Sequence, residues 1–235
     1  MYQNKKVSVV MPAYNEEAYI ATAVTEFKSV QEIDELIVVN NNSTDNTKKL
    51  AIDAGAIVID EKNQGYGYAC QRALRDASGD LIILVEPDGT FSAHDIKKFL
   101  VYSDDFDFVI GTRTAKEMIY EGANMGKFLK WGNWAFAKMI EVLFNGPSLT
   151  DVGCTYRLIK RDALEKIKDK FSVGGSHFSP QMMILAIESG ISMIEIPVSY
   201  KARTGLSKIT GRKWSAFKLG LRMLKLILSY KFWKR

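Results

Sequence analysis

The sequence predicts an α/β fold: a single domain in which a mostly parallel central sheet carries helices on both faces. Between residues 7 and 111, short apolar runs rich in Val and Ile alternate with segments of helical periodicity. These runs are apolar throughout and do not alternate with polar residues, which is typical of strands buried on both faces. A chain of 235 residues suffices for one large domain, and no low-complexity linker divides it.

Each predicted element follows from its local pattern. Strands are predicted, in chain order, where β-branched and other apolar residues cluster, at residues 7–11, 36–39, 56–59, 81–85, 106–110, 152–159 and 191–200. Helices are predicted where apolar residues recur at spacings of three and four, at residues 16–30, 44–54, 66–78, 93–102, 124–144, 161–168 and 180–189. Gly174-Gly175-Ser176 predicts a loop inside the domain.

A last, amphipathic helix is predicted from Trp214, in the most basic part of the chain. Residues 201–235 hold 11 Lys and Arg and no Asp or Glu, whereas residues 1–200 hold 21 basic and 27 acidic residues. One face is apolar and aromatic, formed by Trp214, Phe217, Leu221, Leu224, Leu228 and Phe232. A narrow polar stripe is formed by Lys218, Arg222, Lys225 and Ser229. The pattern favours a membrane interface over nucleic acid or a full span, with docking onto the domain's own core as the alternative.

Composition narrows the class of protein further. No run of about 18 uncharged apolar residues is long enough to span a bilayer. The first residues lead directly into strand-like sequence without a cleavable apolar segment, so we expect a cytoplasmic location. Cys70 and Cys154 lack metal-binding spacing and lie among apolar residues, which indicates plain buried thiols.

Polar side chains follow five of the predicted strands. Ligands of parallel sheets bind outside the carboxyl ends of the strands, so these residues are candidates for one site. They are Asn15, Glu16, Asn41, Asp45, Asn63, Glu86, Asp88 and Arg113.

The segment Glu86-Pro87-Asp88 places two acids at the end of a strand that should be buried. Pro87 cannot continue the hydrogen-bond ladder and fixes its own φ, so the pair is held stiffly. Two neighbouring carboxylates repel one another unless a cation lies between them, and hard oxygen ligands suit Mg²⁺ or Mn²⁺. Glu86 and Asp88 are therefore the candidate metal ligands.

Six blocks together carry a family resemblance: VSVVMPAYNEE, VVNNNSTDNT, KNQGYGYACQRALRDASGDLIILVEPDG, GTR, DVGCTYRLIKRDAL and IPVSYKARTGLSK. In order and spacing the chain resembles family 2 glycosyltransferases of the GT-A fold, which is Rossmann-like. Within that family it is similar to the dolichyl-phosphate mannose synthase-like branch, whose members glycosylate polyprenyl phosphates. The resemblance implies a glycosyltransferase domain over residues 1–212, with a nucleotide-sugar half to about residue 113 and an acceptor half after it. Residues 213–235 would then be a separate membrane-interface helix.

The resemblance also implies roles for individual residues. The base and ribose of the donor would contact Pro12, Ala13, Tyr14, Glu16 and Asn41, with Asn63 on the same rim. Asp88 would hold the divalent metal on the diphosphate, with Glu86 beside it. The phosphates of donor and acceptor would be held by Arg113, Arg203, Ser207 and Lys208, and Asp151 would lie on the acceptor side.

The chain departs from the family pattern at several positions. Glu86 stands where the family has Asp, and Asn40-Asn41-Asn42 stands where an acidic pair is common. Because Asn donates as well as accepts, the donor is open between UDP- and GDP-sugars. Thr155 replaces a glycine, and Gln181 stands where many relatives carry an acid.

The missing acid bears on the reaction. An alcohol acceptor needs a general base, and His177 is a weak candidate, whereas a phosphate monoester is already ionised near neutral pH. We therefore expect inverting transfer to a polyprenyl or dolichyl phosphate at the cytoplasmic face of the membrane. A soluble-sugar or glycolipid acceptor, or a non-catalytic nucleotide-sugar binder, are the alternatives. A nicotinamide site at Gly65-Tyr66-Gly67 is disfavoured because Cys70 stands at the third glycine of that fingerprint. The sequence leaves open a membrane-protein partner or a homo-oligomer.

Overall fold

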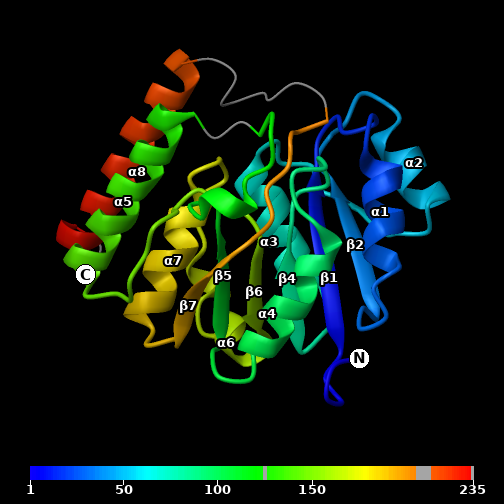
Figure 1. The fold of residues 1–235 in the computed structure, drawn as a ribbon, viewed down its shortest axis with the longest axis horizontal. Helices are drawn as coiled ribbons and strands as arrows, with labels where there is room; N and C mark the ends of the chain where they lie inside the picture. Colours follow the sequence, from blue (N-terminus) through cyan, green and yellow to red (C-terminus); the bar gives the residue numbers. More distant parts are fainter. Residues whose placement is uncertain (124–125, 205–212, 234–235) are drawn as a thin grey trace.

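The predicted α/β fold is confirmed. The structure is a computed structural model, and it describes residues 1–123, 126–204 and 213–233. A seven-stranded sheet has the order β3-β2-β1-β4-β6-β5-β7, and helices lie on both of its faces (Figure 1).

The strands are β1 (Val7–Ala13), β2 (Glu35–Asn40), β3 (Ile57–Asp60), β4 (Leu81–Leu84), β5 (Phe108–Thr112), β6 (Arg157–Lys160) and β7 (Met193–Pro197). The α-helices are α1 (Ile20–Lys28), α2 (Thr47–Asp53), α3 (Tyr66–Asp76), α4 (Ile96–Tyr102), α5 (Lys127–Phe144), α6 (Arg161–Glu165), α7 (Phe178–Glu188) and α8 (Lys213–Phe232).

One strand runs against the others. β6 pairs antiparallel with both β4 and β5, whereas β1–β2, β1–β4, β2–β3 and β5–β7 pair in parallel. The strand predicted at 152–159 begins only at Arg157, because residues 151–153 form a hydrogen-bonded turn in which Asp151 accepts from the Gly153 backbone N–H. The parallel strands all end at the same edge of the sheet, called the rim below, at the top of Figure 1.

Each face of the sheet supports its own apolar core. Alternate residues of one strand enter different cores, so Val9 and Met11 pack with α1 and α4 while Val10 packs with α3. The core that contains Val10 and α3 continues into α5, α7 and α8, which contribute Ile140, Ile184 and other residues. The strands are thus buried on both faces, as their continuous apolar sequences predict.

The basic helix α8 lies beside α5, and the two begin at the rim side of the molecule (Figure 1). One face of α8 docks on the domain, because Met223, Ile227 and Tyr230 are buried in the core. The face that begins with Trp214 and Phe217 is exposed. None of the described helices is long and apolar enough to cross a membrane.

Glycines bring α3 into contact with the loop predicted at 174–176. The Gly67 backbone N–H donates to Gly174 O at 2.9 Å. A Cβ on Gly65 or Gly67 would lie 2.3 Å or 2.1 Å from a backbone oxygen of residues 173–174. The glycines of this segment therefore serve a close approach of two backbones, which places the loop on the wall of the cavity described next.

Candidate functional site

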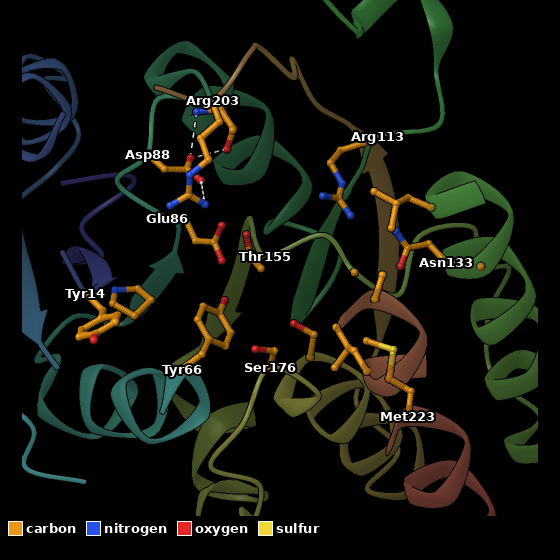
Figure 2. Close-up of a pocket in the computed structure, with 18 of the residues that line it drawn as sticks. Tyr14, Tyr66, Glu86, Asp88, Arg113, Asn133, Thr155, Ser176, Arg203 and Met223 are labelled. Atoms are coloured by element: carbon orange, nitrogen blue, oxygen red, sulfur yellow. Dashed lines mark hydrogen bonds and ion pairs between the residues drawn. The ribbon is translucent and has the colours of Figure 1, made fainter. Parts of the chain in front are cut away.

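A cavity of about 830 Å³ opens at the rim. Its polar side is formed by residues that follow β1, β2, β4 and β5, and its other side by α5 and α8 (Figure 2). Most of the predicted site residues line it, namely Pro12, Ala13, Tyr14, Glu16, Asn41, Glu86, Asp88, Arg113 and Arg203. Asn63 and Asp151 do not line it, and Ser207 and Lys208 lie outside the described residues.

Asp88 lies at the centre of an ion-pair cluster. Its Oδ1 accepts from the backbone N–H and hydroxyl of Thr90, and its Oδ2 lies 3.0 Å from Nη1 of Arg203. The other guanidinium nitrogen of Arg203 donates to Glu16 Oε1 at 2.5 Å. One cation thus bridges two carboxylates, while the buried Nε of Arg203 has no partner among the described residues.

Backbone contacts position Arg203. The segment after β7 runs back along residues 88–91, where Lys201 N donates to Thr90 O at 2.8 Å and Thr204 N donates to Asp88 O at 3.0 Å. A bridge between Phe91 and Tyr200 continues this pairing. Two segments more than 100 residues apart in the sequence therefore meet at the acids.

Glu86 points into the cavity without a hydrogen-bond partner in the described part of the chain (Figure 2). Burial raises the pKa of its carboxyl to about 8, and the neighbouring Asp88 carboxylate acts in the same direction. An acid in this environment is protonated at neutral pH unless a cation compensates its charge. The pair thus has the electrostatic character predicted from Glu86-Pro87-Asp88.

Asp151 is fully buried behind Arg113 and holds it. Asp151 accepts from Arg113 Nε at 2.8 Å, from Nη2 at 2.9 Å and from the Arg113 backbone N–H at 3.0 Å. Burial acts to raise the pKa of Asp151, but the guanidinium and these hydrogen bonds outweigh burial and lower the pKa. Glu195 fixes the turn in front of Asp151 by accepting from the backbone N–H groups of Thr150 and Asp151. Asp151 therefore positions Arg113 at the cavity and does not itself line it.

Asn41 lines the cavity, but its amide is used by the protein. Its NH₂ donates to Glu61 O and Asn63 O, at 3.1 Å and 2.7 Å, and its oxygen accepts from Gly65 N at 2.8 Å. Asn41 thus holds the 61–65 loop closed, and Asn63 contributes a backbone oxygen to that contact. A contact of Asn41 with the base would require one of these bonds to open.

Two other residues weighed from the sequence lie off the cavity. Gln181 is fully buried, where its oxygen accepts from the backbone of Ser172 and Val173 and its NH₂ donates to Tyr230 on α8 at 2.6 Å. It therefore joins α7 to α8. His177 precedes α7 and does not line the cavity; burial lowers its pKa, as does Arg222.

The cavity has lining residues that were not predicted. They are neutral polar side chains, Tyr66, Asn133, Thr155, Ser176 and Ser179, and an apolar wall from α5 and α8, Leu129, Phe136, Phe217, Leu221, Met223 and Leu224. Phe217 and Leu221 line the cavity and are also about half exposed, so they form its mouth.

A divalent metal fits the acid pair by its donor set. Glu86 and Asp88 offer hard carboxylate oxygens beside a cation, Arg203, that already occupies one of them. No group of three His, Cys, Asp or Glu side chains suited to a metal occurs in residues 1–123, 126–204 and 213–233.

Comparison with known proteins gives a consistent match. Residues 8–168 match the glycosyl transferase family 2 domain. A dolichyl-phosphate hexose transferase from Haloferax volcanii is 29% identical over 210 residues, covering 88% of this chain and 88% of that protein. A low-salt glycan biosynthesis hexosyltransferase from the same organism is 33% identical over 204 residues, which is 85% of this chain and 48% of that protein. The chain thus spans about half the length of this second relative.

The fold is also shared with solved structures. Glucosyl-3-phosphoglycerate synthase from Mycobacterium tuberculosis, solved with Mn²⁺, UDP and phosphoglyceric acid, superposes with a TM-score of 0.75 at 18% identity, covering 97% of this chain and 78% of that one. The same enzyme has been solved with Mg²⁺ and UDP, with a TM-score of 0.70 to this chain at 17% identity.

Proposed function

The chain belongs to glycosyl transferase family 2, and we propose that this glycosyltransferase moves a sugar from a UDP- or GDP-sugar onto a polyprenyl or dolichyl phosphate. Transfer would need Mg²⁺ or Mn²⁺, proceed with inversion, and occur on the cytoplasmic face of a membrane. The relative named as a dolichyl-phosphate hexose transferase, which matches along 88% of both chains, supports the acceptor class.

One observation carries the proposal: a single cavity joins a charged rim to an apolar wall. The charged side holds Asp88, Arg113 and Arg203, and the apolar side is built from α5 and α8. A phosphate with a long hydrocarbon chain needs both surfaces in one site, whereas a soluble sugar would leave the apolar wall in water.

The charged side suits the donor. Tyr14 and the residues after β1 would bind the base and ribose, because ligands of parallel sheets bind outside the carboxyl ends of the strands. Asp88 and Glu86 would hold the metal on the diphosphate. A bound divalent ion would compensate charge on the leaving diphosphate. Arg203 can supply further positive charge there, since its Nε–H has no partner among the described residues.

The chemistry of the acceptor follows from the acids in the cavity. Among the described residues that line it, the carboxyls are those of Glu16, Glu86 and Asp88. Glu16 and Asp88 are paired with Arg203, and Glu86 would either ligate the metal or, without the metal, hold a proton, because burial raises its pKa to about 8. An alcohol would therefore lack a ready base, whereas an ionised phosphate oxygen can attack the anomeric carbon directly. A single displacement of this kind inverts the configuration.

Exposed aromatic side chains support a membrane location. Trp131 and Trp134 on α5 and Trp214 and Phe217 on α8 are exposed, and both helices begin at the rim side of the molecule (Figure 1). Lys218 and Arg222 on α8 are exposed as well. Aromatic rings with nearby basic groups bind the interface of an anionic membrane, where the phosphate of the acceptor lies.

The test is release of nucleoside diphosphate from a panel of UDP- and GDP-sugars with Mn²⁺, with and without a short polyprenyl phosphate in detergent. We expect release that depends on both metal and lipid and that is lost in Asp88→Asn. Release should persist in Asp105→Asn, because Asp105 is exposed, precedes the start of β5 and does not line the cavity. Nucleotide binding without lipid-dependent release would exclude the proposed acceptor.

A further inference from the structure

Neutral hydroxyl groups cluster in one part of the cavity. The side chains of Tyr66, Thr155, Ser176 and Ser179 line it, and the hydroxyl of Tyr66 has no oxygen or nitrogen partner among the described residues. Figure 2 shows Tyr66 and Ser176 on the opposite side of Glu86 from Arg203. This part of the cavity is polar but holds no cation among the described residues.

Tyr66 is the most unusual member of this cluster. Its ring packs against the core, and its hydroxyl is shielded from solvent without an oxygen or nitrogen partner in the described part of the chain. Burial raises its pKa well above the usual value, with the Cys70 thiol and Glu86 acting in the same direction, so the hydroxyl keeps its proton and remains a donor. The neighbour that the hydroxyl contacts is the Cys70 thiol, and sulfur is a weak acceptor. A buried donor without a strong acceptor is costly, and Phe would fill the same space without that cost.

We propose that the Tyr66 hydroxyl donates a hydrogen bond to a hydroxyl of the donor sugar, and that Thr155 and Ser176 complete a pocket that selects the sugar. This inference rests on the proposed function, because it takes a nucleotide-sugar to be the ligand.

The other parts of the substrates fit this pocket less well. A phosphate requires cations, and Arg113 and Arg203 lie elsewhere in the cavity. A lipid chain would leave the Tyr66 hydroxyl as unpaired as before. A sugar offers several hydroxyls that both donate and accept. In a nucleotide-sugar the sugar is joined directly to the diphosphate, which Asp88 would hold. Because Asp88 is two residues from Glu86, the sugar would lie next to Glu86.

The experiment is calorimetric titration of the wild type, Tyr66→Phe and Tyr68→Phe with UDP-glucose, GDP-mannose and the matching diphosphates, UDP and GDP, each with Mn²⁺. Tyr68 lies on the same helix, is exposed and does not line the cavity, so its variant also loses one hydroxyl but not one in the cavity. For the nucleotide-sugar that binds, we expect Tyr66→Phe to weaken affinity about 3- to 10-fold, the effect of one neutral hydrogen bond. The matching diphosphate should bind unchanged, and Tyr68→Phe should alter neither affinity.

Thermal unfolding of the free variants separates recognition from structure. Removing a hydroxyl whose described partner is only the weakly accepting Cys70 thiol should leave the midpoint of Tyr66→Phe unchanged or higher. A lowered midpoint, or an equal loss of affinity for the nucleotide-sugar and its diphosphate, would show that the hydroxyl is structural and overturn the inference. Unchanged affinity for the nucleotide-sugar would overturn it while leaving the proposed function intact. If the wild type binds neither nucleotide-sugars nor diphosphates, the proposed function fails and this inference fails with it.

Discussion

Replacing Asp151 by Asn should destabilise the protein strongly, because it leaves the Arg113 charge buried and unpaired. The side chain of Asp151 is 0% exposed and that of Arg113 is 11% exposed, and two hydrogen bonds of 2.8 Å and 2.9 Å join them. Breaking a buried pair by removing one partner costs about 3–5 kcal/mol. For a domain of this size that loss lowers the thermal midpoint by roughly 6–20 °C. The assay is urea denaturation followed by circular dichroism, with a parallel thermal scan.

Two further variants make the test specific. Asp53→Asn removes an exposed partner of Lys49 and should leave the denaturation midpoint unchanged. Adding Arg113→Met to Asp151→Asn removes the unpaired charge and should recover most of the lost stability. A loss below about 1 kcal/mol in Asp151→Asn, or no recovery in the double variant, would refute the argument, because the guanidinium would then be solvated when Asp151 is neutral.

The remaining predictions concern other parts of the molecule. The pKa of Glu86, about 8, lies above its value in an unfolded chain, so the folded state binds the proton of Glu86 more tightly. The contribution of Glu86 to stability should therefore fall as pH rises from about 4.5 to 8. Urea denaturation at pH 5 and pH 8 should show that the Glu86→Gln variant lacks this fall. A Cβ on Gly174 would lie 2.1 Å from the ring of Tyr68, so thermal scans should show a lower midpoint for Gly174→Ala. A Cβ on Gly132 of α5 meets nothing within 4 Å. Because Ala favours a helix, Gly132→Ala should raise the midpoint, with a gain in stability of about 0.5–1 kcal/mol. Replacing both Trp214 and Phe217 by Ala should weaken co-sedimentation with anionic vesicles by about tenfold or more. Val142 is also exposed but lies near the C-terminal end of α5, so Val142→Ala should not weaken it. Equal losses would contradict a membrane surface at the rim side.

The fold was largely predictable because continuous apolar runs allow few arrangements. A run such as Leu81–Leu84 must be covered on both faces, and helices of matching length lie between the runs. The direction of β6 was not predictable. Arg157–Lys160 has the same kind of sequence as a parallel strand, and its antiparallel pairing depends on the path of residues 113–156 through α5.

The site was predictable in position but less so in the role of each residue. Residues that follow parallel strands must meet at the rim, so most of the predicted residues line one cavity. Whether a polar side chain there faces a ligand depends on partners far away in the sequence. Asn41 is engaged by the 61–65 loop and Asp151 by Arg113, and neither pairing has a local sequence signal. Tyr66 was not predicted as a site residue, because an aromatic residue at the start of a helix usually indicates only core packing. Its hydroxyl faces the cavity, which the sequence does not reveal.

Helix α8 shows why two interpretations of one sequence can hold together. An apolar face suggested a membrane interface, and docking onto the domain was the alternative. Because most of the circumference of α8 is apolar, one face docks on the domain, where Ile227 is buried, and another face with Trp214 stays exposed for the membrane interface that we propose. Leu224, between these faces, lines the cavity. A helix is about 10 Å across with its side chains, so a lipid held at the outer face of α8 lies about that distance from the cavity wall. One helix would thus offer a surface to the membrane on one side and a wall to the acceptor on the other. A substitution such as Leu221→Asp at the mouth should therefore impair both vesicle binding and lipid-dependent turnover.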